Sequence, residues 1–254
     1  MTASRASRRL AWALPWILLA TAVSAKPQPV LELHSGARVG LVTVLDAEVT
    51  HYHGAAQVMA SSLKTQPVPW RVDLILGQAL QAPLTALGLV VVPLPPGEAL
   101  SGLREECFLE ANLTKPLSKQ CAAPYAALAA AQHLDAIIVL GPGLNNGVHA
   151  DATRRKDLPE YLRGWCVLTD GRMPASAPTL LNLTEMLLIA STPQGAVLAG
   201  RQWGGVSTSG WTSFTPQADP KQLTDAQIEQ LQPLFATMVR TQAQLLIDNL
   251  HVAR

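Results

Sequence analysis

The chain is short of charged residues, aromatic residues and cysteines. Only 15% of its 254 residues are charged and 5% are aromatic, whereas soluble domains average about 25% charged residues. The 19 basic and 18 acidic side chains nearly cancel, so the composition gives no electrostatic reason to expect nucleic acid or an anionic membrane as a partner. Apolar residues, in contrast, make up 48% of the chain. They suffice for a substantial core, and the length fits one domain or at most two small ones.

Several catalytic and membrane signatures are missing too. After residue 22, no apolar run reaches the ~20 residues of a membrane span without a charge or a proline. The G-x-S-x-G elbow of serine hydrolases is absent, since GVSTSG at residues 205–210 has no predicted helix behind it. Neither the dinucleotide fingerprint nor a P-loop lysine occurs. With no catalytic motif in view, the sequence favours a protein that is not an enzyme.

The first 25 residues have the layout of a secretory signal peptide. A basic start with Arg5, Arg8 and Arg9 precedes an apolar run over residues 10–22, and small residues end at Ala25. Cleavage there removes three of the 19 basic residues and leaves 16 basic and 18 acidic ones, a net charge of −2. We expect a soluble, exported protein, periplasmic or secreted, without stable membrane insertion. The arginine pair leaves general and twin-arginine export both open.

Three cysteines fit an oxidising compartment. Cys107 and Cys121 bracket a loop-like segment, and a disulfide between them would contribute about 3 kcal/mol by loop entropy. Two free, buried thiols are the alternative. Cys166 lies in an apolar run and is predicted to be a core residue rather than a nucleophile.

The opening stretch of the predicted domain is Arg38–Gly54. Residues 39–45 form an apolar, β-branched run, Asp46-Ala47-Glu48 suits a tight turn, and residues 49–53 are typical of a second strand. The pattern predicts a hairpin. Residues 26–37 are predicted to be a flexible lead-in, and the proline-punctuated residues 55–69 a loop.

Two repeats of helix, short link and apolar strand follow. Residues 72–87 show a helical stripe interrupted by Pro83, and the strand Leu89–Leu94 comes after Gly88. The alanine-rich residues 124–134 predict a helix before the strand Asp135–Leu140. This rhythm is typical of parallel strands, and their lack of alternation predicts cover on both faces.

The last third of the chain predicts further strands and a helix. Residues 165–169 suit a short strand, residues 180–191 and 196–203 suit a second hairpin, and residues 224–252 suit a long helix with Thr224 or Asp225 as N-cap. We therefore predict one three-layer α/β domain over residues 38–254. It has a mixed sheet, hairpins at both ends and a long C-terminal helix.

The strongest candidate for chemistry is the pair His51 and His53. Side chains two apart in a strand leave from the same face, so both imidazoles can meet one metal ion at about 2.0 Å. A divalent metal would need a third ligand. The donors available in the sequence are His34, Asp46, His149 and Asp151.

The loop after the second parallel strand is the candidate mouth of a ligand pocket. Open α/β sheets bind ligands at the carboxyl ends of their strands, and the glycine-rich segment 141–147 follows such an end. Its backbone N–H groups could bind an anion. The candidate ligand-binding residues are Gly141, Gly143, Asn145 and Asn146; a simple chain turn is the alternative.

Three of these segments carry a resemblance. Over Arg38–Gly54, residues 72–87 and residues 135–147, the chain resembles an uncharacterised family of exported proteobacterial proteins that begin with a similar GLVTVL-type strand. In element order it is also similar to periplasmic α/β modules of the TolB N-terminal, curli-secretion and penicillin-binding-protein-activator type. Those modules end in a hairpin, like residues 187–201 here, and a closing helix. The resemblance implies an adaptor in envelope assembly, without the lipoprotein cysteine that many of these modules carry.

Three functions remain open from the sequence. The first is a soluble binding or adaptor module of the cell envelope, whose partner is an envelope protein or a small ligand. The second is a metal-dependent hydrolase that uses His51 and His53. The third is a small-ligand binder at residues 141–147.

Overall fold

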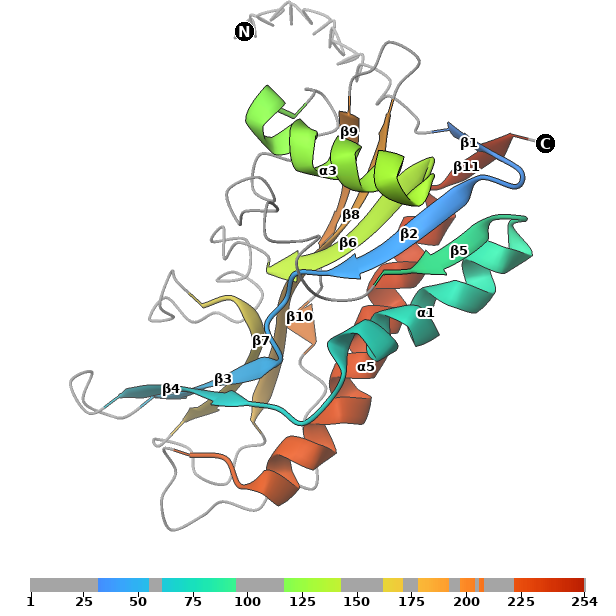
Figure 1. The fold of residues 1–254 in the computed structure, drawn as a ribbon. Coiled ribbons are helices and arrows are strands. Elements are labelled where there is room, and N and C mark those ends of the chain that lie inside the picture. Colours follow the sequence, from blue (N-terminus) through green and yellow to red (C-terminus); the bar gives the residue numbers. More distant parts are fainter. Residues whose placement is uncertain are drawn as a thin grey trace, which may run out of the picture.

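One mixed sheet forms the centre of the molecule (Figure 1). The computed structural model describes residues 32–54, 61–94, 117–142, 162–170, 178–191, 197–203, 206–207 and 222–253. The main sheet has nine strands in these segments, seven of them in the order β4-β3-β7-β8-β6-β2-β5, with β9 and β10 also paired to β8. The strands of this sheet are β2 (Arg38–Thr43), β3 (Glu48–Gly54), β4 (Ser62–Pro67), β5 (Val90–Pro93), β6 (Ala136–Pro142), β7 (Gly164–Asp170), β8 (Thr179–Ser191), β9 (Val197–Trp203) and β10 (Val206–Ser207).

The long strand β8 holds two groups of strands together. Its first half pairs antiparallel with β7 and its second half pairs antiparallel with β6. Pro142, the last residue of β6, lies opposite Thr184, and Gly164, the first residue of β7, lies opposite Leu183. The end of one strand and the start of the other therefore occupy neighbouring positions along β8.

The predicted opening hairpin is wrong. Strands β2 and β3 do not pair with each other: β2 lies between β5 and β6, parallel to both, and β3 lies between β4 and β7. Because both edges of β2 are occupied, no edge is left for β3. The polar residues at 46–48 make a bend that carries the chain from one group of strands to the next. The hairpin at this end of the chain is β3 with β4, whereas the predicted hairpin of β8 and β9 is confirmed.

The parallel part of the sheet is doubly wound; the α/β rhythm predicts the parallel strands but not this winding. The chain runs from β2 through helix α1 (Val72–Ala86) to β5 on one side, and then through helix α3 (Lys119–Gln132) to β6 on the other side. The two helices cover opposite faces of the sheet (Figure 1). Since the direction of winding reverses at β2, the border between β2 and β6 is the topological switch point of this sheet.

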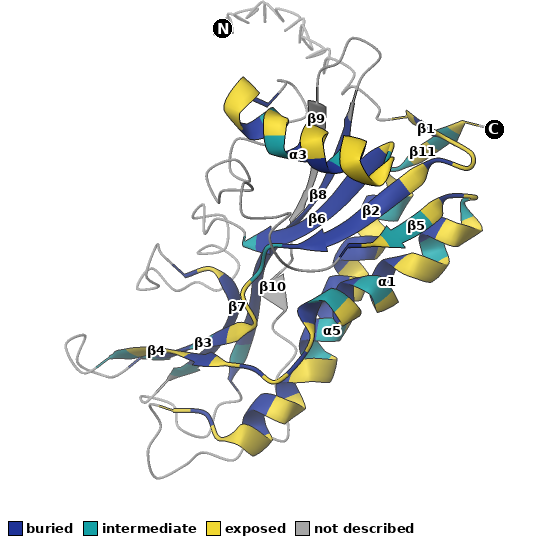
Figure 2. Ribbon diagram, viewed as in Figure 1, coloured by how far each residue is buried: buried dark blue, intermediate teal, exposed yellow. Residues whose placement is uncertain are grey.

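The two faces of β6 show why its sequence is continuously apolar. Ala136, Ile138 and Leu140 pack with α1 and α5 (Asp225–Asp248), while Ile137 and Val139 pack with α3. Figure 2 shows β6, β2 and β8 as the buried centre between exposed outer helix surfaces. The α/β domain with helices on both faces of a mixed sheet is therefore confirmed.

Strand β5, unlike β6, is not fully covered on both faces. It is an edge strand, paired only with β2, and Val90 keeps 44% of its surface exposed. Val91 packs toward one core cluster and Val92 toward the other. The prediction of full cover on both faces is thus wrong for β5, because an apolar run does not reveal whether its strand lies at the centre or at the edge of a sheet.

The helix boundaries follow capping residues. At the start of α5, Thr224 and Gln227 form a reciprocal capping box, which confirms Thr224 as N-cap. This helix ends at Asp248, earlier than predicted. Helix α3 begins at Lys119 after the N-cap Ser118, so Pro124 lies inside it rather than in its first turn. Within the described segments, no helix has the length and apolar character that crossing a membrane requires.

Two segments predicted to be irregular form strands. Residues 32–34 are the strand β1 (Glu32–His34), which pairs in parallel with β11 (His251–Ala253) and buries Leu33. Within the predicted loop at 55–69, β4 pairs with β3. Neither β1 nor β4 has a strong sequence pattern of its own. Each becomes a strand because the fold places a partner strand beside it. The prediction of a flexible lead-in is therefore wrong over Glu32–His34.

Candidate functional site

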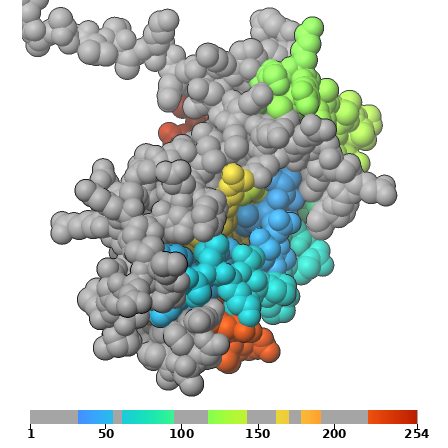
Figure 3. All heavy atoms as spheres, turned by 90° about the vertical axis from the view of Figure 1, so that its left-hand side faces the viewer, coloured from blue at the N-terminus to red at the C-terminus, as the bar shows by residue number. Residues whose placement is uncertain are grey.

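A hollow opens at the switch point of the sheet. Its volume is about 140 Å³, and it lies where β2 and β6 end and β7 begins. On this side of the molecule, atoms of β2 (blue), β7 (yellow) and β3 with β4 (cyan) lie close together (Figure 3). The described residues that line the hollow are Val44, Leu45, Asp46, Glu48, Thr50, Pro142, Arg163, Gly164 and Trp165.

The backbone explains why space is left at this point. Two strands end and two others begin at this point of the sheet. Strand β2 ends at Thr43 and β3 begins at Glu48, while β6 ends at Pro142 and β7 begins at Gly164. Gly164 adopts a φ of +68°, a left-handed conformation that glycine tolerates best, and a Cβ at this residue would lie 3.3 Å from Leu45 Cδ1. The turn into β7 therefore needs a small residue beside the hollow.

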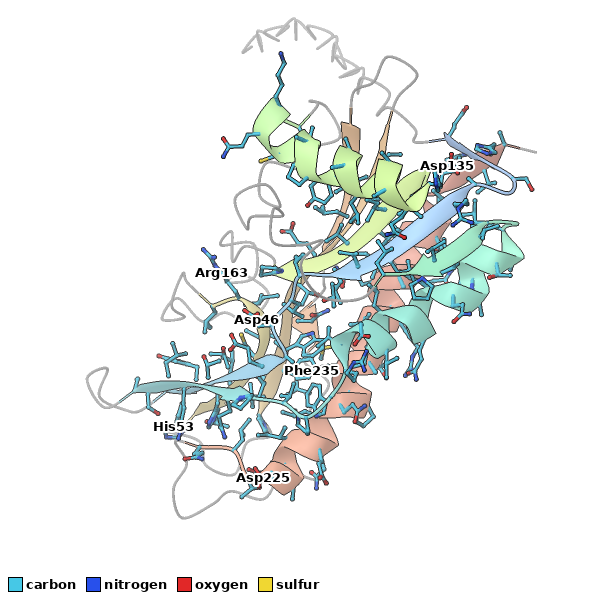
Figure 4. The ribbon with its side chains drawn as sticks, viewed as in Figure 1. Asp46, His53, Asp135, Arg163, Asp225 and Phe235 are labelled. Atoms are coloured by element: carbon cyan, nitrogen blue, oxygen red, sulfur yellow. The ribbon has the colours of Figure 1, made fainter. Side chains whose placement is uncertain are left out.

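Charged side chains lie at the rim. Asp46 belongs to the bend between β2 and β3, Glu48 is the first residue of β3, and Arg163 precedes β7; Asp46 and Arg163 are labelled in Figure 4. Burial, together with the negative charge of Asp46, raises the pKa of the Glu48 carboxyl above its ordinary value. A positively charged group placed beside the two carboxylates would relieve their repulsion.

The predicted ligand loop meets this hollow in part. Gly141 is in β6, and its neighbour Pro142 lines the hollow. Gly143, Asn145 and Asn146 lie outside the described residues, so their role in ligand binding stays a prediction. The hollow itself lies at the carboxyl ends of the parallel strands, which is where open α/β sheets bind ligands.

Sequence reasoning missed most of the lining. The sequence patterns give Asp46 only a turn and a metal-donor role, and they do not identify Glu48, Arg163 or Trp165 as binding residues. Asp46 and Glu48 follow the carboxyl end of a parallel strand, which is the signal that could have identified them. The predicted hairpin concealed this signal, because it made the same residues a turn.

The two candidate metal ligands do share one face. His51 Nε2 and His53 Nδ1 both lie 2.8 Å from Thr169 Oγ1, which comes from the neighbouring strand β7. Their ring centroids are 6.4 Å apart. His51 is buried, with 2% of its surface exposed, and His53 is half-buried. The hydroxyl of Thr169 thus lies at the point on which both rings converge.

Among the described residues, no third protein ligand for a divalent metal completes a group with them. Across the described segments, no group of three His, Cys, Asp or Glu side chains has the spacing of a metal site. His34 belongs to β1, Asp46 lines the hollow, and His149 and Asp151 lie outside the described residues. The metal-dependent hydrolase stays a prediction.

The cysteines have distinct places. Cys166 is a free thiol, fully buried, and donates a hydrogen bond to the Arg163 carbonyl oxygen. Burial raises the pKa of this thiol to about 12, which fits the predicted core residue and not a nucleophile. Cys121 is buried in the first turn of α3, whereas Cys107 lies outside the described residues. Their disulfide stays a prediction.

Comparison with known protein families, with curated proteins and with solved structures finds no match to this chain. The resemblance to exported proteobacterial proteins and to periplasmic adaptor modules therefore stays a prediction. The candidate site has to be interpreted from its own geometry.

Proposed function

We propose that this protein is a binding protein, not an enzyme, and that it holds a small polar molecule at the switch point between β2 and β6. The observation that carries the proposal is the hollow of about 140 Å³ at the carboxyl ends of these parallel strands. Open α/β sheets bind ligands at such a place because the loops on its two sides diverge there.

The size and lining favour a particular kind of ligand. The volume of about 140 Å³ is smaller than the roughly 300–1,000 Å³ of sites for drug-sized ligands, so the hollow suits a compact metabolite or one end of a larger one. Leu45 and Trp165 offer apolar contact, and the charged lining consists of two carboxylates, Asp46 and Glu48, and one guanidinium, Arg163, so its net charge is negative. We therefore assign a ligand with a positively charged amino group and a short apolar part.

The test is a binding screen on the full-length protein. Thermal unfolding is measured with a panel of amino acids, short diamines, small sugars and small carboxylic acids. We expect compounds with an amino group to raise the melting temperature, since a ligand at a hundred times its Kd stabilises the folded state by about 2.7 kcal/mol. Hits are confirmed by calorimetry.

Two variants locate the site. Asp46→Asn combined with Glu48→Gln removes both negative charges without a large change in volume, and we expect it to abolish binding of the amine. Glu229→Gln on the exposed side of α5 is the matched control and keeps binding. A panel without any hit, or a double variant that binds as well as the parent protein, would contradict the proposal.

The cellular setting belongs to the same proposal. The signal-like residues 1–25 support an exported binding or adaptor module of the envelope that works alone or with an envelope protein. Mass spectrometry of the protein recovered from a bacterial host tests this. A mature chain that begins at Lys26 is expected, and an intact N-terminus in the cytoplasmic fraction would contradict export.

A further inference from the structure

The hollow at the switch point is lined by charges of both signs. Asp46 and Glu48 supply two carboxylates where the chain passes from β2 to β3, and Arg163 supplies a guanidinium just before β7. The fold brings these elements together at one place (Figure 4). An amine ligand accounts for the two carboxylates but gives no role to Arg163.

The register of the sheet places the two kinds of charge on neighbouring parts of the chain. Strands β3 and β7 run parallel, and the first pair in their ladder is Val49 with Trp165. Glu48 comes one residue before this pair and Arg163 comes two residues before it. Because neighbouring strands lie about 4.8 Å apart, both residues reach the same hollow from adjacent segments.

The carboxylates and Arg163 do not neutralise each other. Among the contacts of the described residues, no ion pair joins Arg163 to Asp46 or Glu48. Burial and the charge of Asp46 raise the pKa of Glu48, whereas a guanidinium beside this carboxyl would lower it. Opposite charges therefore line one hollow at separate positions, and a ligand that carries both signs can meet both.

The rest of the lining limits the size of such a ligand. Thr50 adds a hydroxyl on the same face of β3 as Glu48, because the two residues are two apart in the strand. Val44, Leu45 and Pro142 add apolar surface. Within a volume of about 140 Å³, there is room for two small charged groups and a short aliphatic part.

We infer that the ligand is a small amino acid bound as a zwitterion, an inference that rests on the proposed function. Its ammonium group lies at Asp46 and Glu48, and its carboxylate lies at Arg163, since a guanidinium presents a planar fork of donors that matches a carboxylate. Its short side chain contacts Leu45. Arg163 thereby determines specificity, because it makes the site prefer an amino acid over an amine with the same carbon chain.

Four compounds with related carbon skeletons separate the two charges. Valine carries both, isobutylamine lacks the carboxylate, valinamide has a neutral amide in its place, and isovalerate lacks the amino group. Calorimetry at pH 7 measures their affinities for the full-length protein. A hydrogen bond to a charged group is worth about tenfold in affinity or more, so valine should bind at least about tenfold more tightly than isobutylamine or valinamide.

Substitutions of Arg163 test where the carboxylate binds. Arg163→Gln should weaken valine binding at least about tenfold and remove the preference for valine over isobutylamine. The backbone carbonyl of this residue, which accepts the hydrogen bond of Cys166, is retained. Arg163→Lys keeps the positive charge and should restore part of the preference. Arg240→Gln, which removes a positive charge from an exposed position on α5, is the matched control and keeps the full preference.

The outcomes distinguish this inference from the proposed function. Equal affinities for valine and isobutylamine would overturn the zwitterion and leave the amine site standing, as would a preference for valine that survives in Arg163→Gln. Isovalerate that binds as tightly as valine would show that the ammonium group is not recognised, and would overturn both. A protein that binds no amine at all would also overturn both.

Discussion

The substitution Phe235→Ala probes the contact between α5 and the sheet. Phe235 is fully buried on α5 and stacks on Trp165 of β7, with ring centroids 5.1 Å apart and planes 16° apart. Trp70, just before α1, completes the cluster at 6.1 Å from Phe235 and 5.5 Å from Trp165. Three elements that are distant in the sequence thus meet in this aromatic cluster.

The expected loss of stability follows from these contacts. Truncation of a buried phenylalanine to alanine costs about 3–5 kcal/mol, a range that already includes the lost ring contacts. Each aromatic pair is worth about 0.5–1.5 kcal/mol beyond the area that it buries, and Phe235 makes two, so we expect a loss in the upper part of this range, about 4–5 kcal/mol in the free energy of unfolding. That is a large part of the 5–15 kcal/mol that is typical of a folded protein.

Urea unfolding followed by tryptophan emission measures this loss, because Trp70 and Trp165 are buried in the cluster. The control is Leu245→Ala on the same helix, where the side chain is 46% exposed and the cost should stay below about 1 kcal/mol. A loss of less than about 1.5 kcal/mol for Phe235→Ala would refute the close packing of α5 on β7.

Four further predictions follow from single residues. Cys166, with its pKa raised to about 12, should resist thiol reagents at pH 8 in the folded protein and react in urea, as site-specific mass spectrometry can show. The pKa of the Cys166 thiol is higher in the folded protein than its unfolded value of about 8.5. The thiol therefore contributes fully to stability below about pH 8, and this contribution is lost as the pH rises toward 12. Unfolding free energies that do not fall over this pH range would contradict the prediction. Thr224→Ala should lower the unfolding free energy by about 1 kcal/mol through loss of the capping box, while Thr224→Ser should keep it. Gly164→Ala should lower the unfolding free energy by about 1 kcal/mol or more, because the residue has a φ of +68°, and should weaken ligand binding because the new Cβ contacts Leu45. Gly77 lies inside α1, and a Cβ there meets open space, so Gly77→Ala should raise the unfolding free energy by about 0.5–1 kcal/mol in the same assay.

The sequence by itself determined the class of the fold and those local elements that have a strong pattern of their own. The stripe in residues 72–87 became α1, and the apolar runs at Leu89–Leu94 and Asp135–Leu140 became parallel strands, because hydrophobic periodicity and short links constrain neighbouring residues. Thr224 could be recognised as an N-cap because capping acts within one helical turn. The common face of His51 and His53 followed from the two-residue period of a strand.

Only the tertiary structure decided which strands pair and where the candidate site lies. Whether residues 46–48 reverse the chain or carry it onward depends on the partners of β2 and β3, and these partners, β6 and β7, lie about a hundred residues away. The same long-range pairing makes β5 an edge strand and lets β1 join β11. Asp46, Glu48 and Arg163 meet around one hollow for this reason, since no local pattern records which strand ends become neighbours.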